Sequence, residues 1–277
     1  MTQRHILSFL VAATALAAAL TAPTAASAWA PEGSATIHPG VQTYTEGGQC
    51  TANFIYTSGS EVFIGQAAHC SGTGAATQTD GCESPSRPLG TKVEVNGASR
   101  PGTMVYNSWL TMQANGERDA DACAYNDLAL LKIDPADVGK VNPSVPGFGG
   151  PNGVGGARAL ADVFSYGNSS LRLGLTQTSP KQGKVVRVDG GGWTRDVYTA
   201  TPGIPGDSGS GFLNRSGQAL GTLSTVAVLP LPASNGVADL GKELGYARAN
   251  GFGALALADG TRAFRPNLVG AILGVSR

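Results

Sequence analysis

The sequence predicts an all-β fold built from many short strands. Its 277 residues include 40 glycines and 16 prolines, which implies frequent tight turns. Few stretches have the apolar spacing of a long helix, whereas short apolar runs recur along the chain. A barrel or a sandwich would satisfy both observations. The strands that we expect are 52–56, 61–67, 92–95, 128–133, 184–188, 197–201 and 219–228.

One helix is expected near the C-terminus. Asn235 can cap its start and Gly251 can end it. A short hairpin should follow, where 254–257 precede a turn at 259–260. The segment 145–156, rich in glycine and proline, is the best candidate for a linker. The apolar residues at helical spacing are Val237, Leu240, Leu244 and Ala247.

The first 28 residues have the pattern of a secretory signal peptide. Arg4 supplies a positive start, 6–20 is apolar, and Ala26-Ser27-Ala28 is a small-residue cleavage site. Removing 28 of the 277 residues leaves 249, a size within the range of one all-β domain. No later stretch approaches the roughly 18 apolar residues that a membrane span needs. We therefore expect a secreted, extracellular protein that is not held in a membrane.

The charge of the chain does not indicate a partner. The 19 basic and 19 acidic residues balance, and loss of Arg4 with the signal peptide leaves one negative charge in excess. Such a balance provides no basic field for nucleic acid or an anionic lipid surface. We expect neither of these partners, and we expect a monomer.

The four cysteines predict disulfides rather than a metal site, because the chain is expected to be exported. No Cys-x-x-Cys spacing occurs, and only His38 and His69 remain after processing. Four cysteines allow three pairings, and the spacing does not choose among them. We expect no metal and no cofactor.

Three short motifs occur in the order base, acid, nucleophile. They are Ala67-Ala68-His69-Cys70, Asn126-Asp127 before an apolar run, and Gly206-Asp207-Ser208-Gly209. An imidazole, a carboxylate and a hydroxyl are the groups that acyl transfer requires. No Asp lies between the signal peptide and His69, and no His follows Ser208, which excludes the subtilisin and α/β-hydrolase orders. The remaining order and all three motifs resemble those of chymotrypsin-like serine peptidases, of the secreted bacterial type.

This resemblance covers residues 50–226 and implies a specific architecture. Two six-stranded antiparallel β-barrels would hold the active site in the cleft between them, with a helix near the C-terminus. One peptidase domain would span 29–277, with a first barrel at about 36–145 and a second at about 157–277. His69 and Asp127 would lie on the first barrel and Ser208 on the second.

The resemblance also assigns a role to each motif residue. Ser208 would be the nucleophile, His69 the general base and Asp127 the group that orients His69. The N–H groups of Gly206 and Ser208 would form the oxyanion hole. Ser224 would hydrogen-bond Asp127.

Asp207 would face inward in an ion pair. The segment 37–40 does not match the new N-terminus that supplies the partner cation in the family, so an internal cation is the alternative. For the disulfides, the resemblance favours Cys50 with Cys70, which leaves Cys82 with Cys123.

The primary specificity pocket is expected at two segments. By family spacing, Pro202 and Gly203 form its floor, and Ser224, Thr225 and Val226 form one wall. No carboxylate stands at the floor and no histidine is free nearby, so a charged side chain would be buried without a partner. Val226 replaces the glycine of larger pockets. We therefore expect cleavage after small or medium apolar residues such as Ala, Val or Leu.

The predicted function is that of a secreted serine endopeptidase, which hydrolyses peptide bonds of proteins or peptides through an acyl-enzyme. Two alternatives remain open. A catalytically silent binding module could keep the fold, although it would normally have lost His69, Asp127 or Ser208. An esterase could use the same triad, because ester and amide acyl transfer share their intermediate.

Overall fold

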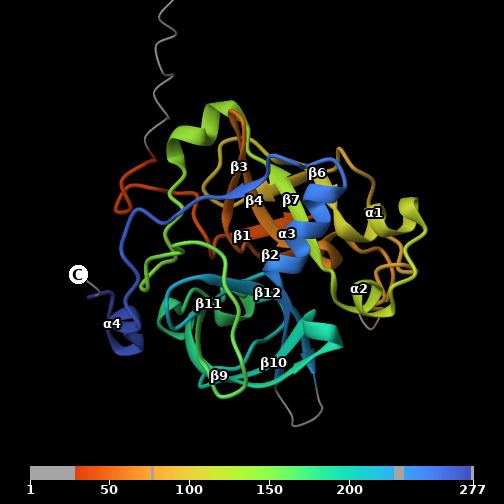
Figure 1. The fold of residues 1–277 in the computed structure, drawn as a ribbon. Helices are drawn as coiled ribbons and strands as arrows, with labels where there is room; N and C mark the ends of the chain where they lie inside the picture. Colours follow the sequence, from red (N-terminus) through yellow and green to blue (C-terminus); the bar gives the residue numbers. More distant parts are fainter. Residues whose placement is uncertain (1–28, 76–77, 228–233, 276–277) are drawn as a thin grey trace, which may run out of the picture.

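An eight-stranded antiparallel sheet and a closed six-stranded barrel make up most of the molecule (Figure 1). The computed structural model describes residues 29–75, 78–227 and 234–275, without the side chains of residues 226 and 227. The expected signal peptide, 1–28, lies outside the described residues. Within the described part of the chain, no helix has the length and apolar character that crossing a membrane requires.

The eight-stranded sheet has the order β14-β3-β4-β7-β6-β5-β1-β2. β4 and β7 pair in register from Phe63 with Lys132 to Ala67 with Leu128, and this pairing fixes the segments that follow β4 and precede β7. The strands are β1 (Gln42–Thr45), β2 (Gly48–Thr51), β3 (Ile55–Ser58), β4 (Glu61–Ala67), β5 (Lys92–Val95), β6 (Gly102–Asn107), β7 (Leu128–Lys132) and β14 (Ala256–Leu257).

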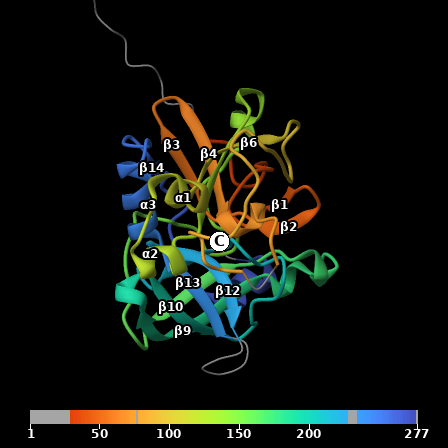
Figure 2. The ribbon, with the colours of Figure 1, turned by 90° about the vertical axis from the view of Figure 1, so that its right-hand side faces the viewer.

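The closed barrel has the strand order β10-β13-β12-β11-β8-β9. It lies below the sheet in Figure 1, and Figure 2 shows β12 and β13 running side by side. Its strands are β8 (Asp162–Tyr166), β9 (Pro180–Asp189), β10 (Thr194–Thr199), β11 (Gly211–Asn214), β12 (Ala219–Ala227) and β13 (Ser234–Asp239).

The helices are short. The longest, α3 (Leu240–Ala249), follows the last barrel strand and packs against β12. The others are α1 (Ser108–Asn115), α2 (Ala120–Tyr125) and α4 (Leu268–Leu273), with 3₁₀ turns η1 (Ala68–Ser71), η2 (Pro135–Lys140), η3 (Ser170–Arg172), η4 (Thr176–Thr178) and η5 (Gly190–Gly192).

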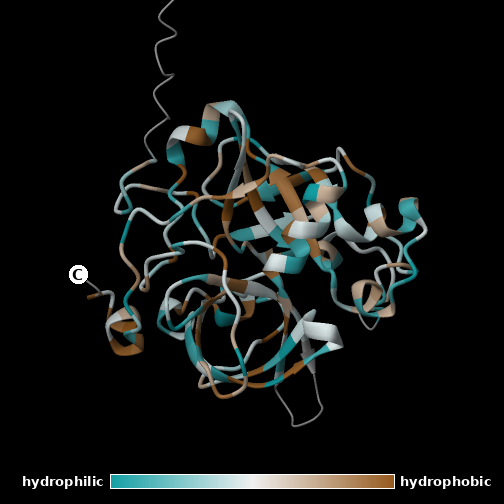
Figure 3. Cartoon of the chain, in the orientation of Figure 1, coloured by the Kyte–Doolittle hydropathy of each residue, from teal (hydrophilic) through white to brown (hydrophobic). Residues whose placement is uncertain are grey.

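A shared apolar core joins the sheet, the barrel and α3. The hydrophobic residues in Figure 3 gather on the central strands, β7 among them. One buried cluster contains Leu128 and Leu130 from the sheet, Leu213 from the barrel and Leu240 and Leu244 from α3. Burial of apolar surface from both units stabilises their docking, because each buried side chain of this size contributes roughly 1.5–3 kcal/mol.

The predicted all-β class and the six-stranded closed barrel are confirmed. The other sheet has eight strands rather than six, because β14 adds at one edge and the β1–β2 hairpin forms the other. β14 pairs with β3, so this C-terminal segment contacts the first sheet rather than the barrel. The expected division between the two units stays a prediction.

The predicted start of the C-terminal helix was wrong. The residues from Ser234 to Asp239 form β13, and the helix begins only at Leu240. The backbone of β13 is paired with β10 on one side and with β12 on the other, and closure of the barrel outweighs the local helical spacing. Asp239, not Asn235, caps the helix by accepting a hydrogen bond from the N–H of Lys242.

Two disulfides are present, Cys50–Cys70 and Cys82–Cys123. The first joins β2 to η1, and the second ties the loop after η1 to α2. Both pairings agree with those that the family resemblance implies, and all four cysteines are engaged.

Candidate active site

His69 and Asp127 are paired at the ends of two neighbouring strands. His69 lies in η1 just after β4, and Asp127 lies just before β7. The Nδ1 of His69 is 2.7 Å from Oδ2 of Asp127, and the backbone N–H of His69 donates to Oδ1 at 2.8 Å. With Nδ1 donating to the carboxylate, Nε2 of the neutral ring is left free to accept a proton.

One residue of the closed barrel and one of α3 complete the surroundings of Asp127. The hydroxyl of Ser224, on β12, donates to Asp127 Oδ2 at 2.5 Å. The carboxyl of Glu243, on α3, accepts the backbone N–H of Asp127 at 3.1 Å. Asp127 is 2% exposed, and its carboxylate needs donors such as His69 and Ser224 because an unpaired buried charge is costly.

Ser208 lies in a tight loop between Gly206 and Gly209. Gly206 has φ +94° and Gly209 has φ +87°, in the left-handed region that favours glycine. A Cβ on Gly209 would also lie 2.5 Å from the carbonyl oxygen of Thr51. Among the described residues, the N–H groups of Gly206 and Ser208 have no hydrogen-bond acceptor, so both can bind a ligand oxygen.

The carbonyls of the loop are anchored to β2. The Oγ1 of Thr51 donates to the Gly206 carbonyl at 2.7 Å, and Nε2 of Gln49 donates to the same oxygen at 3.0 Å. The N–H of Thr51 donates to the Ser208 carbonyl at 2.8 Å. Anchoring the carbonyls fixes the orientation of the loop that bears the two free N–H groups.

His69 and Ser208 line one cavity of about 600 Å³, together with Ser224 and Thr225. No hydrogen bond between the Ser208 hydroxyl and His69 is present in the described part of the chain. Hydrogen bonds of this type are often long in an unliganded site and tighten when substrate binds. The structure therefore brings two of the three predicted residues, His69 and Ser208, into one cavity without a direct contact between the hydroxyl and the imidazole, and Asp127 lies buried behind His69.

Asp207 has two internal cations as partners. Its Oδ2 lies 2.6 Å from Nη2 of Arg172 and 3.0 Å from Nζ of Lys181. The side chains of Asp207 and Lys181 are fully buried, and that of Arg172 is 9% exposed. The sequence did not single out either cation. A buried lysine in β9 and a loop arginine carry no motif, and only the fold brings them to Asp207.

The segment predicted as the pocket floor, Pro202 and Gly203, is held by residues of β9 and β13, and it is not among the residues that line the cavity of about 600 Å³. The Nζ of Lys181 donates to the carbonyl of Pro202 at 3.1 Å, and the N–H of Gly203 donates to Oδ1 of Asn235 at 3.0 Å. Asn235 also donates to the Val197 carbonyl at 3.1 Å and so links the floor to β10. The side chain of Val226 lies outside the described residues, so its expected effect on the entrance stays a prediction.

The loop that follows His69 forms the opposite wall of the cavity. The cavity is lined there by Gly72, Gln78 and Pro85 of this loop and by Trp109 of α1. The disulfide Cys82–Cys123 ties this loop to α2, and Nε2 of Gln113 donates to the carbonyls of Gly81 and Ser84, each at 2.8 Å. The disulfide is one that the family resemblance implies, but no motif in the sequence indicates that this loop forms a wall of the cavity.

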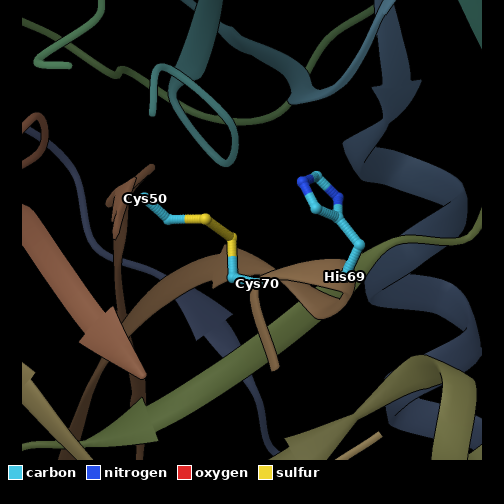
Figure 4. Close-up of side chains that lie close together, drawn as sticks. All are labelled: Cys50, His69 and Cys70. Atoms are coloured by element: carbon cyan, nitrogen blue, oxygen red, sulfur yellow. A yellow bond between two sulfur atoms is a disulfide. The ribbon is translucent and has the colours of Figure 1, made fainter. Parts of the chain in front are cut away.

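Cys50, His69 and Cys70 cluster closely enough to suggest a metal-ligand set (Figure 4). However, the two sulfur atoms are bonded to each other, so neither is a thiolate. The imidazole alone remains, and it is hydrogen-bonded to Asp127. The cluster is therefore a disulfide beside a paired histidine.

Solved structures with a similar fold include several bacterial serine proteases. Protease A of Thermobifida fusca superimposes with a TM-score of 0.53 at 19% identity, over 81% of this chain and 99% of that one. The chain therefore has the chymotrypsin-like fold. A Cellulomonas bogoriensis chymotrypsin gives 0.49 at 16% identity (80% and 98% covered), and a Nocardiopsis protease gives 0.47 at 17% (80% and 98%). No protein-family model and no curated protein sequence matches this chain.

The first prediction concerns the buried ion cluster. Asp207→Asn leaves Arg172 and Lys181 without their anion, so we expect the free energy of unfolding to fall by about 3–5 kcal/mol. The loop that presents the Gly206 N–H should also be displaced, lowering the rate of any acyl transfer at Ser208 by roughly a hundredfold. Urea unfolding and the rate of Ser208 acylation measure the two effects.

We expect Arg172→Met to lower the free energy of unfolding and the acylation rate less than Asp207→Asn does, because Lys181 still pairs with the carboxylate. Arg215→Met is the matched control, since it removes an exposed arginine that is paired with Asp162, and it should stay near wild type. Wild-type unfolding and acylation in Asp207→Asn would contradict the role of the cluster.

The second prediction concerns the protonation of His69. Burial lowers the pKa of His69, but the charge and the hydrogen bond of Asp127 outweigh it, so the pKa lies above the ordinary 6.5. Burial lowers the pKa of His38, and the Pro39 carbonyl and Glu32 oppose it only in part. Because a base must be unprotonated, a reaction that uses His69 should be lost as the pH falls through the raised value.

Histidine NMR titration of the processed chain measures both groups, because 29–277 contain only these two histidines. We expect the His69 midpoint above 6.5 and the His38 midpoint below it. Asp127→Asn should lower the His69 midpoint. A His69 midpoint at or below that of His38 would show that the Asp127 carboxylate does not stabilise the imidazolium.

Proposed function

We propose that the protein is a secreted serine endopeptidase in which Ser208, His69 and Asp127 act as nucleophile, general base and orienting acid. The observation that supports this most is the cavity of about 600 Å³ shared by Ser208 and the Asp127-paired His69. Two free N–H groups, of Gly206 and Ser208, belong to the same loop. The fold is also that of Thermobifida fusca Protease A. The two disulfides and the apolar stretch at 6–20 favour an extracellular location.

In the proposed reaction, Oγ of Ser208 forms a bond to the substrate carbonyl carbon while its proton passes to Nε2 of His69. The N–H groups of Gly206 and Ser208 donate to the oxyanion that develops. His69 then returns the proton to the leaving amine as the C–N bond breaks. Water hydrolyses the resulting acyl-enzyme by the same steps, again with His69 as base, and releases the acid.

The third prediction tests this assignment. A fluorophosphonate should label Ser208 alone, and both Ser208→Ala and His69→Ala should abolish labelling and peptide hydrolysis. Asp127→Asn should fold normally and lose roughly four decades in kcat, because the imidazole then favours the wrong tautomer. Intact-mass and peptide mapping identify the labelled serine, and fluorogenic peptides give the rates.

The control is Ser170→Ala, since Ser170 is an exposed loop serine, and it should be labelled at the wild-type rate. Hydrolysis of simple esters without any peptide would favour the esterase alternative. Absence of labelling and turnover in the wild-type protein would favour a silent binding module. Full activity in Ser208→Ala would refute the proposed nucleophile.

The fourth prediction concerns the residue that precedes the cut. The described residues that line the cavity include no Asp, Glu, Lys or Arg, and the cation Lys181 lies just behind the carbonyl of Pro202. A basic side chain in the cavity would therefore find no free carboxylate, because the nearby Asp207 is buried and already paired with Arg172 and Lys181. We expect cleavage after Ala, Val or Leu.

Mapping the cut sites in a denatured protein substrate measures this preference. If Val226 narrows the pocket, the Val226→Gly variant should also cleave after Phe or Tyr. The control Val186→Gly, at an exposed position of β9, should not gain this cleavage. A profile dominated by Arg, Lys or Glu would show that the pocket lies elsewhere.

A further inference from the structure

Glu243 is a fully buried carboxyl that the proposed reaction does not use. It lies on α3, and its exposed fraction is 0%. Its Oε1 accepts the backbone N–H of Asp127 at 3.1 Å, and its Oε2 accepts the hydroxyl of Thr222 at 3.1 Å. Thr222 in turn accepts Nδ2 of Asn53 at 3.4 Å. Glu243 is therefore the link between the barrel strand β12 and the backbone of Asp127.

No cation compensates this carboxyl. None of the ion pairs among the described residues includes Glu243. The titratable groups that face it are Asp127, at the head of β7, Asp239, the cap of α3, and the phenols Tyr56 and Tyr106, from β3 and β6. Burial, and then the charge of Asp127, raises the pKa of Glu243 well above its usual value, although the bonds from Asp127 and Thr222 oppose the rise.

The geometry points to Glu243 as a positioning residue that holds Asp127 against His69 and does so as an uncharged acid. The inference rests on the proposed function for its kinetic consequence. A neutral carboxyl keeps an acceptor for the Asp127 N–H, and the Thr222 hydroxyl can either donate to its carbonyl oxygen or accept its proton. It adds no second negative charge beside Asp127, so Asp127 alone sets the field at His69. An ionised Glu243 would be a like charge close to Asp127 and would be unpaired.

The test compares Glu243→Gln with Glu243→Leu. Gln keeps an acceptor for the Asp127 N–H and a donor for Thr222, so we expect kcat within about twofold of wild type and an unchanged His69 midpoint. Leu leaves the Asp127 N–H buried and unpaired. We expect it to lower kcat by about tenfold to a hundredfold with little change in KM, and to lower the His69 midpoint.

Thr222→Ser and Thr222→Val give a second comparison if Glu243→Leu does not fold. Thr222→Ser keeps the hydroxyl and should behave as wild type. Thr222→Val removes the hydroxyl at similar volume and should lower kcat, as Glu243→Leu is expected to do. Lys242→Gln is the matched control, because Lys242 is the exposed neighbour of Glu243 on the same helix. It should leave both kcat and the His69 midpoint unchanged.

Two outcomes would overturn the inference. A His69 midpoint lowered by more than about half a unit in Glu243→Gln would show that Glu243 carries a charge. Wild-type kcat and an unchanged midpoint in folded Glu243→Leu would show that it does not position Asp127. A wild-type protein that neither reacts with a fluorophosphonate nor cleaves peptides would refute the proposed function alone. The NMR midpoint of His69 requires no turnover, so it would still decide the inference in that case.

Discussion

The burial of the Asp127 carboxylate is the constraint on which the rest of the site depends. A carboxylate removed from water must be surrounded by donors, and Asp127 receives them from two different β-units. His69, from the end of β4, provides its ring and its backbone N–H, whereas Ser224 provides a hydroxyl from β12. The arrangement therefore exists only when the sheet and the barrel are docked, which the shared apolar core ensures.

The site contains a second buried carboxylate, Asp207, that is compensated in a different way. Two cations contact it, and its loop is fixed from beneath while the N–H groups of Gly206 and Ser208 face the cavity. The two kinds of compensation correspond to two different proposed roles. In the proposed mechanism, Asp127 acts on the imidazole through one unshared negative charge, and hydrogen-bond donors surround it. In the same proposal, Asp207 holds the loop in place, and full ion pairing serves that purpose without altering a titrating group.

The sequence predicts those parts of the site that one short segment determines. His69, Asp127 and Ser208 each belong to a local motif, and the order of the motifs along the chain excludes the subtilisin and α/β-hydrolase arrangements. Arg172, Lys181 and Glu243 belong to none, because each acts through a contact between distant segments, such as the 116 residues that separate Asp127 from Glu243. One signal for Glu243 was available, since it stands on the same helical face as Leu240, Leu244 and Ala247, where a charge is unexpected.

The prediction for the segment that forms β13 was wrong for a related reason. Its sequence, Ser-Asn-Gly-Val-Ala-Asp, has no alternation of apolar and polar residues and merges with the spacing of α3. Its conformation comes from pairing on both edges inside the closed barrel, which no local pattern contains. The same error hid the contacts of Asn235, because a residue interpreted as a helix cap joins Gly203, in the predicted pocket floor, to β10.

The charges of the site lie beneath the cavity surface rather than on it. Asp127, Asp207 and Lys181 are buried, and His69 is the one titratable group among the described residues that line the cavity. A substrate would therefore meet hydroxyls, amides, backbone N–H groups and the faces of Trp109 and Pro85. Recognition by such a surface depends on shape and on backbone hydrogen bonds, because it offers no ion pair to a substrate side chain. The buried charges act on the loop and the imidazole that would do the chemistry, where the low surrounding polarity makes their effect strongest.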